Sequence, residues 1–316
     1  MSMATTVVVV DAMWREGEGQ IGVRLVDAVG ADLPHFEAGA HVDLHLPGGL
    51  VRPYSIASDP ADRTQFVLCV KREAASRGGS SAVHDRLRVG DRVMISMPRH
   101  GFGLRPATHH VLVAGGIGIT PLIAMAETLA YRGESFVLHV FVSTLSQLPF
   151  ASRLARGFSG GTVRLHVGAA GASPRGGLPP SFAPYAEGAR LYQCGPAGLM
   201  AIVRETALAG GWPADRLHGE AFAAAVPPDS GGDAFEVVLA RSGRVFSVPA
   251  GRSIAEVLVE AGVDVPLSCS VGICGCCLTR VREGEIDHRD EVTGGTGDEI
   301  ALCCSRSLSP RLVLEM

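Results

Sequence analysis

The chain has 316 residues, of which 47% are hydrophobic and 19% are charged, so wholesale disorder is excluded and more than one domain can bury a core. Its 28 Lys and Arg against 32 Asp and Glu leave a formal charge of −4, without a basic block that could follow a phosphate backbone, so we expect no nucleic-acid partner. The most apolar stretch, Val111 to Ala130, is interrupted by glycines, a proline and a glutamate, which predicts strand, loop and helix instead of a membrane span. Because no secretion signal is visible, we expect a cytoplasmic protein without a membrane anchor.

Residues 1–104 contain short β-rich runs separated by Gly, Pro and Asp turns, which predicts a small antiparallel β-barrel domain. The runs are Thr6–Val10, Ile21–Val26, Val51–Ile56 and Phe66–Lys71.

Strand and helix patterns alternate over residues 105–222, which predicts an α/β domain with a parallel sheet. The expected strands are His110–Ala114, Phe136–Val142, Val163–Val167 and Arg190–Cys194, and the expected helices are Pro121–Tyr131 and Gly198–Leu208.

Residues 223–233 are small and polar, with two prolines and two glycines, and are typical of an interdomain linker. The remaining residues, 234–316, begin with two strand-like runs, Phe235–Leu239 and Val245–Val248, followed by a helix near Ser253–Ala261. A cysteine-rich loop and closing strands come next, so we expect a third, α+β domain.

Eight cysteines are too few for a disulfide scaffold, and six of them lie between Cys269 and Cys304. Cys269, Cys274 and Cys277 have the C-x4-C-x2-C spacing of plant-type [2Fe–2S] centres, with a fourth thiolate at Cys303 or Cys304. The alternative is a structural zinc site, which usually uses two short cysteine pairs, and the second pair is missing here.

This segment resembles plant-type ferredoxins, which implies a β-grasp domain. In those proteins a small aliphatic residue typically follows the last ligand, and this alignment makes Cys303 the fourth ligand and leaves Cys304 as the alternative.

The run Arg52-Pro53-Tyr54-Ser55 combines an aromatic ring that could cover an isoalloxazine, a hydroxyl for its redox-active edge and a guanidinium for a phosphate. It resembles the R-x-Y-S motif of ferredoxin–NAD(P)⁺ reductase-like flavoproteins, in which Tyr and Ser contact the flavin. On its own, the run could also be an ordinary strand.

A second group of backbone amides, cations and a hydroxyl predicts an anion site. A glycine turn with a serine helix cap would show the same sequence pattern and is the alternative. Its members are Val70, Lys71, Arg77, Gly79 and Ser80. The close linkage of the two motifs resembles the FMN-containing phthalate dioxygenase and vanillate demethylase reductases and implies FMN in preference to FAD.

A strand is followed by Gly115-Gly116-Ile117-Gly118-Ile119-Thr120-Pro121, which would place backbone amides and a helix start at a pyrophosphate. The run lacks the G-x-G-x-x-G fingerprint, but it resembles the pyridine-nucleotide loop of the same reductase family. This resemblance implies nucleotide contacts from Gly115, Gly116, Gly118, Thr120 and Pro121.

Cys194-Gly195-Pro196 resembles the C-G-P motif that lies beside the nicotinamide in this family, which implies that Cys194 helps to position hydride transfer. With Ser55, whose hydroxyl the R-x-Y-S resemblance places near the redox-active edge of the flavin, Cys194 is a candidate catalytic residue. A buried cysteine before a Gly-Pro turn is the alternative. Phe222 is the candidate for the aromatic residue that relatives place near the flavin. No acidic residue or arginine cluster follows the second strand near Val142, which favours NADH and leaves NADPH open.

The order of barrel, nucleotide domain and ferredoxin domain resembles the reductase component of class IA Rieske oxygenase systems. It implies electron flow from NADH through FMN and [2Fe–2S] to a Rieske-type oxygenase or demethylase that acts on an aromatic substrate. A flavin is needed between a two-electron donor and a one-electron acceptor. Alternatives are a reductase for a cytochrome P450, a free flavin reductase, and a zinc-stabilised or redox-sensing binding protein.

Overall fold

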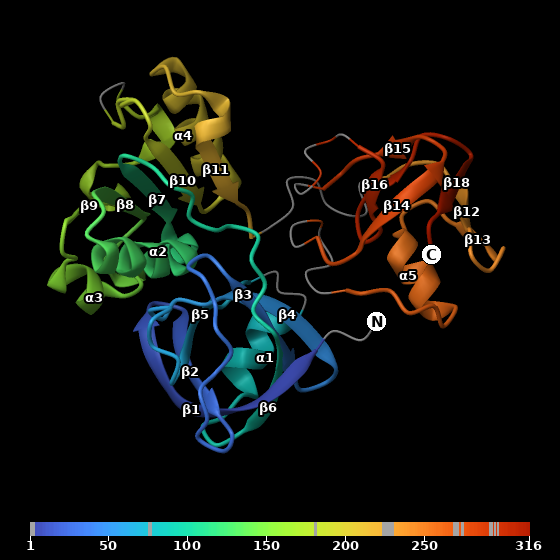
Figure 1. Cartoon of the computed structure of the whole chain (residues 1–316), viewed down its shortest axis with the longest axis horizontal. Helices are drawn as coiled ribbons and strands as arrows, with labels where there is room; N and C mark the ends of the chain where they lie inside the picture. The colour runs from blue at the N-terminus through green and yellow to red at the C-terminus, as the bar shows by residue number, and fades with distance from the viewer. Residues whose placement is uncertain are drawn as a thin grey trace. The chain divides into compact units, whose positions relative to one another are not determined.

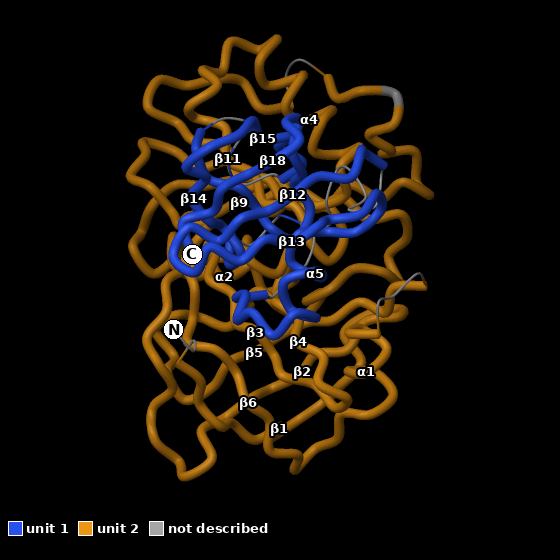
Figure 2. The backbone as a smooth tube through the Cα atoms, turned by 90° about the vertical axis from the view of Figure 1, so that its right-hand side faces the viewer, with its two compact units in different colours: residues 1–2, 223–316 blue, residues 3–222 orange. Residues whose placement is uncertain are grey.

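The computed structural model describes residues 4–74, 78–179, 182–222, 231–267, 272, 275–290, 293, 295 and 297–316. The chain forms two compact units, residues 3–222 and a second unit from Ala223 to Met316 (Figure 2). Among the described residues, no helix is long and apolar enough to cross a bilayer. Each unit is considered by itself.

The first part of residues 3–222 is a six-stranded antiparallel barrel with strand order β4-β3-β6-β1-β2-β5 (Figure 1). Alternating residues such as Val8, Leu25, Leu44 and Leu68 point inward and are fully buried, as period-two patterning requires. The strands are β1 (Thr5–Gly17), β2 (Gln20–Asp27), β3 (His41–Leu46), β4 (Leu50–Ser55), β5 (Phe66–Lys71) and β6 (Arg92–Ser96), and helix α1 (Gly79–Asp85) follows β5.

The second part is a five-stranded parallel sheet with strand order β11-β10-β7-β8-β9. Leu112 and Ala114 of β7 pack in the same core as α2, whereas Val111 and Val113 pack with residues of α4, so helices cover both faces of the sheet (Figure 1). The elements are β7 (His110–Gly115), α2 (Ile119–Arg132), β8 (Phe136–Val142), α3 (Ala151–Arg156), β9 (Gly161–Val167), β10 (Arg190–Cys194), α4 (Ala197–Ala209) and β11 (Leu217–Glu220).

A few residues of the barrel are buried in the hydrophobic core of the parallel sheet, which is why two domains expected from the sequence form a single compact unit. Ala57 and Cys69 of the barrel are buried in the same cluster as Leu122 and Met125 of α2. The antiparallel barrel, the parallel sheet and the mixed third domain are the architecture that the sequence predicts.

The second unit is a mixed five-stranded sheet with strand order β13-β12-β18-β14-β16, together with helix α5 and a short antiparallel pair, β15–β17. A capping box begins α5: the Ser253 hydroxyl accepts the N–H of Glu256, and the Glu256 carboxylate accepts the N–H of Ser253. The elements are β12 (Phe235–Leu239), β13 (Val245–Val248), α5 (Ile254–Glu260), β14 (Leu278–Glu283), β15 (Ile286–Asp287), β16 (Glu299–Ala301), β17 (Arg306–Ser307) and β18 (Arg311–Leu314).

The described start of this second unit is held by two arginines. Arg306 is only 2% exposed, and its guanidinium donates to the carbonyls of Asp233 (2.9 Å), Pro249 (3.2 Å) and Arg252. Arg289 donates to the carbonyl of Gly231 at 2.7 Å. A buried cation is tolerated here because several carbonyl dipoles replace its water.

Candidate functional site

Three adjacent strands of the parallel sheet bring polar groups to one edge. The register pairs Cys194 of β10 with Ala114 of β7 on one side and with Glu220 of β11 on the other. Because these are the carboxyl ends of parallel strands, they form the edge at which α/β sheets bind nucleotides.

The glycine loop and the Cys-Gly-Pro turn meet through their backbones. A Cβ on Gly118 would clash with the carbonyl oxygen of Cys194 and lie 2.7 Å from the nitrogen of Gly195, and a Cβ on Gly195 would lie 2.9 Å from Gly115 Cα. Only glycine fits at Gly118 and Gly195, so the backbones of the glycine loop and the Cys-Gly-Pro turn can pack directly against each other.

Helix α2 begins at Ile119, two residues earlier than the sequence predicts, because Gly116–Gly118 form a 3-10 turn that leads directly into it. Pro121 is therefore the third helical residue, still within the first turn, where its missing N–H leaves no helical bond unmade. Thr120 is buried, and its hydroxyl donates to the carbonyl of Ile117 at 3.0 Å, so this side chain stabilises the loop.

The buried Cys194 and the partly buried Glu220 lie side by side next to this loop. Burial, assisted by the nearby Glu220 carboxylate, raises the pKa of the Cys194 thiol well above its usual range, so Cys194 is a neutral thiol. Burial also raises the pKa of Glu220 to about 8, and its buried Oε2 has no hydrogen-bond partner among the described residues. Glu220 was missed in the sequence, where a single carboxylate after a short strand carries no recognisable pattern.

The raised pKa of Glu220 makes stability depend on pH. Folded Glu220 keeps its proton up to about pH 8, whereas the unfolded chain releases it near the usual glutamate pKa of 4.5, so unfolding releases a proton between these values and stability falls as pH rises. We expect the variant Glu220→Gln to gain stability relative to the wild type across this window, by up to about 1.4 kcal/mol per pH unit. Urea unfolding at about pH 5 and about pH 8 gives the free energy of unfolding of both proteins. If this free energy changed equally with pH in the wild type and in Glu220→Gln, the prediction would be contradicted.

The flavin motif lies where β4, β5 and α1 meet. A Cβ on Gly79 would lie 2.5 Å from the Cγ of Arg52, so the start of α1 packs directly against the arginine side chain. His84 of α1 contacts the carbonyl of Val70 at 3.0 Å, and the Ser80 hydroxyl accepts the N–H of Glu73.

The other residues that are expected to bind the flavin differ in their exposure. Burial raises the pKa of Tyr54 to about 12, so its phenol is neutral, and Ser55 is buried at the end of β4. Lys71 is exposed and pairs with Glu73 at 3.1 Å. Phe222 is 40% exposed at the end of the first unit, and Arg77 lies outside the described residues. A guanidinium, an ammonium and a serine hydroxyl thus come from adjoining elements, which fits a flavin phosphate.

The cysteine loop has the features of a cluster site in its described part. Cys277 and Cys303 are buried, and their segments are neighbours because Leu278 of β14 pairs with Ala301 of β16. The N–H of Gly272 donates to the Sγ of Cys303 at 3.2 Å, the kind of bond that stabilises iron-bound thiolates. These residues fit an iron–sulfur cluster. Cys269 and Cys274 lie outside the described residues.

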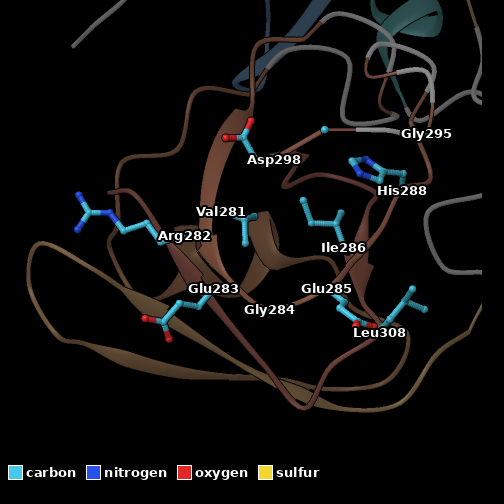
Figure 3. Close-up of a pocket in the computed structure, with 11 residues that line it drawn as sticks. Val281, Arg282, Glu283, Gly284, Glu285, Ile286, His288, Gly295, Asp298 and Leu308 are labelled. Carbon is cyan, nitrogen blue, oxygen red and sulfur yellow. The ribbon is translucent and has the colours of Figure 1, made fainter.

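The second unit also has a groove of about 580 Å³ that contains none of these site residues. Figure 3 shows His288, Ile286 and Leu308 on one side of it and Arg282 and Glu283 on the other. A second groove, in the first unit, lies along residues 100–105 and β11. Those expected site residues that the structure describes therefore lie on loops and strand ends outside both grooves.

Comparison with known proteins agrees with this arrangement. Residues 237–307 match the model of the 2Fe-2S iron-sulfur cluster binding domain. Vanillate O-demethylase oxidoreductase from a Pseudomonas species is 42% identical over 98% of this chain and 99% of the relative. The solved structure of phthalate dioxygenase reductase, described as a modular structure for electron transfer from pyridine nucleotides to [2Fe–2S], superposes with a TM-score of 0.77, 36% identity, and 99% and 98% coverage of the two chains.

A third similarity is to an intact type IV self-sufficient cytochrome P450 monooxygenase, with a TM-score of 0.83 and 34% identity, covering 99% of this chain and 41% of that one.

The fold and the site define an oxidoreductase that joins a flavin barrel, a pyridine-nucleotide domain and a ferredoxin unit. The chain belongs to the family of oxygenase reductases that includes vanillate O-demethylase oxidoreductase and phthalate dioxygenase reductase. It transfers electrons by way of a flavin and a [2Fe–2S] cluster.

Proposed function

We propose that this chain is an NADH-dependent reductase that uses FMN and a [2Fe–2S] cluster to supply a Rieske-type oxygenase or demethylase acting on an aromatic substrate. The observation that supports the proposal is the close backbone contact of Gly118 with Cys194 and Gly195 at the sheet edge, where a Cβ on Gly118 would not fit. It brings the glycine loop directly against the Cys-Gly-Pro turn, the two motifs that are expected to bind the nucleotide. We propose the module boundaries 1–104, 105–222 and 234–316, with a linker at 223–233.

The first unit binds and orients the donor and the flavin. Backbone amides of Gly115, Gly116 and Gly118 receive the pyrophosphate, and the neutral Cys194 thiol packs against the nicotinamide. Arg52, Ser80 and Lys71 bind the flavin phosphate, with Val70 and Gly79 shaping the loop. Tyr54, Ser55 and Phe222 contact the ring system. When bound, the flavin accepts two electrons from NADH and releases them one at a time.

NADH is favoured over NADPH by the residues that follow β8, the second strand of the parallel sheet in chain order. This strand ends at Val142, and Ser143 and Thr144 follow it without a cation that could bind a 2′-phosphate.

Four cysteines hold the cluster in the second unit: Cys269, Cys274, Cys277 and Cys303. Cys303 and Cys304 are both buried, and the bond from Gly272 to the Sγ of Cys303 supports Cys303 as the fourth ligand, with Cys304 as the alternative. Burial of Cys277 and Cys303 excludes water from this side of the centre and tunes its potential.

A haem partner is the second candidate, because a part of the self-sufficient cytochrome P450 monooxygenase matches 99% of this chain. The two candidate functions differ in the protein that accepts the electrons, so an assay of electron acceptors distinguishes them. Purified protein reduced by NADH is offered a Rieske-type oxygenase or a cytochrome P450, and we expect faster reduction of the Rieske centre. Faster reduction of the haem would favour the second function.

The cofactor part of the proposal is tested on the purified protein. We expect FMN released on denaturation, two irons per chain, and bleaching of both chromophores by NADH, with NADPH acting more slowly. FAD in place of FMN, or zinc in place of iron, would contradict it.

A further inference from the structure

Arg153 of helix α3 connects the barrel to the parallel sheet. Its Nη1 donates to the carbonyl of Ala57 at 2.7 Å, and its Nη2 donates to Oε1 of Glu127 at 2.9 Å. The side chains of Arg153 and Glu127 are 22% and 20% exposed, so both groups are largely shielded from water. A single guanidinium therefore makes charge-assisted bonds to both parts of the first unit.

Both partners of Arg153 are close in sequence to the redox site. Ala57 lies two residues after Ser55, the end of the flavin motif, and is fully buried. Glu127 is on α2, the helix that begins at the glycine loop. Arg153 thus links the segment that follows the flavin motif with the helix that follows the nucleotide loop.

The position of Arg153 is itself fixed by a constrained turn. Phe150 precedes α3 with φ 55°, the only positive φ of a non-glycine residue among the described residues. Its N–H donates to Oε1 of Glu16 in the barrel at 2.9 Å, while Oε2 of Glu16 accepts from the Trp14 indole at 2.5 Å. The guanidinium carbon of Arg153 lies 5.2 Å from the centroid of the buried Phe150 ring. Such a backbone conformation persists only where its surroundings hold it.

We propose that Arg153 is a positioning residue for flavin reduction: it sets the distance and angle between the flavin motif and the nucleotide loop. This inference rests on the proposed function. Arginine suits the role because its planar fork donates in two fixed directions, whereas the single ammonium of lysine is a flexible point charge. Neither cofactor needs to touch Arg153.

The test compares two arginines of the same helix. Arg153→Met keeps the aliphatic packing on Phe150 and removes the donors. Arg156→Met is the matched control, because Arg156 is 71% exposed and its closest approach to Glu127 is 3.9 Å. Stopped-flow reduction of the flavin by NADH gives the limiting rate and the nucleotide dissociation constant separately.

We expect Arg153→Met to lower the limiting rate by about tenfold to a hundredfold, the size of effect that small misplacements of reactants produce. The dissociation constant should change by less than about threefold, because nucleotide contacts are kept. The long-wavelength absorbance of nicotinamide stacked on oxidised flavin should weaken in parallel. Arg156→Met should behave as the wild type.

A purely structural role predicts a different result, namely a lower melting temperature with an unchanged limiting rate, and that result overturns the proposal. An equal slowing in Arg156→Met also overturns it. If Arg153→Met is isolated without flavin, Arg153→Lys is measured in the same way: an intermediate rate supports the proposal and a wild-type rate refutes it.

Failure of the proposed function is distinguishable from failure of this inference. The proposed function fails if the wild-type flavin is not reduced by NADH at all. The role of Arg153 is judged by the ratio of variant to wild-type rate, measured on protein with equal flavin content.

Discussion

Cys303→Ala is expected to lose the [2Fe–2S] cluster, while Cys304→Ala retains it. The Sγ of Cys303 receives the N–H of Gly272, whereas the Sγ of Cys304 lies 4.0 Å from the carbonyl of Ala301 and 3.9 Å from the hydroxyl of Ser305. Since thiolates bound to iron accept N–H bonds, the bond from Gly272 supports the proposal that Cys303 is the fourth ligand. Alanine is preferred to serine because a serine oxygen could still coordinate iron.

The expected loss is large. Electron transfer from NADH to a one-electron acceptor should fall by at least about 100-fold in Cys303→Ala, since even residues beyond the ligands can cost that much. Reduction of the flavin by NADH should remain, because it occurs in the other unit. Iron analysis and electron paramagnetic resonance of the dithionite-reduced proteins provide the measurement. Cluster loss in Cys304→Ala with retention in Cys303→Ala would reverse the assignment.

Gly118→Ala is expected to slow flavin reduction by NADH on the order of a hundredfold, as a displaced nucleotide loop should. The backbone of Gly118 has φ −62°, which any residue adopts, so the substitution adds no backbone strain. Its effect comes from the added Cβ, which would clash with the Cys194 carbonyl and push the Cys-Gly-Pro turn away from the loop.

The matched control is Gly198→Ala in α4, where a Cβ meets nothing within 4 Å. Alanine is a better helix former than glycine, so this control should be neutral or slightly stabilising. Pre-steady-state reduction by NADH measures both variants. A wild-type rate for Gly118→Ala would show that the close contact of the two loops has no part in binding the nucleotide.

Much of the fold could be predicted because the strand and helix patterns are strong and local. The expected runs Phe66–Lys71 and Phe136–Val142 coincide with β5 and β8, and the cysteine spacing identifies the ferredoxin unit. Strands β3 and β6 and helix α3 were not predicted. Helix α3 has only six residues, and its first turn depends on Glu16, 134 residues before Phe150.

The parts of the site that sequence could not reveal depend on contacts between distant segments. Glu220 becomes significant only when β11 pairs with β10, because burial beside Cys194 is what raises its pKa. The proposed role of Arg153 depends on its hydrogen bond to the carbonyl of Ala57, which lies 96 residues earlier in the chain. Local patterns predict elements and motifs, but burial and long-range pairing decide which single side chains matter.

The two arginines that hold residues 231–233 also determine how the ferredoxin unit can be produced separately. A recombinant fragment that starts at Phe235, the first strand residue, would lack the Asp233 and Gly231 carbonyls, and the guanidinium of Arg306 would be buried with fewer acceptors. A fragment intended to fold and hold its cluster should therefore start no later than Gly231.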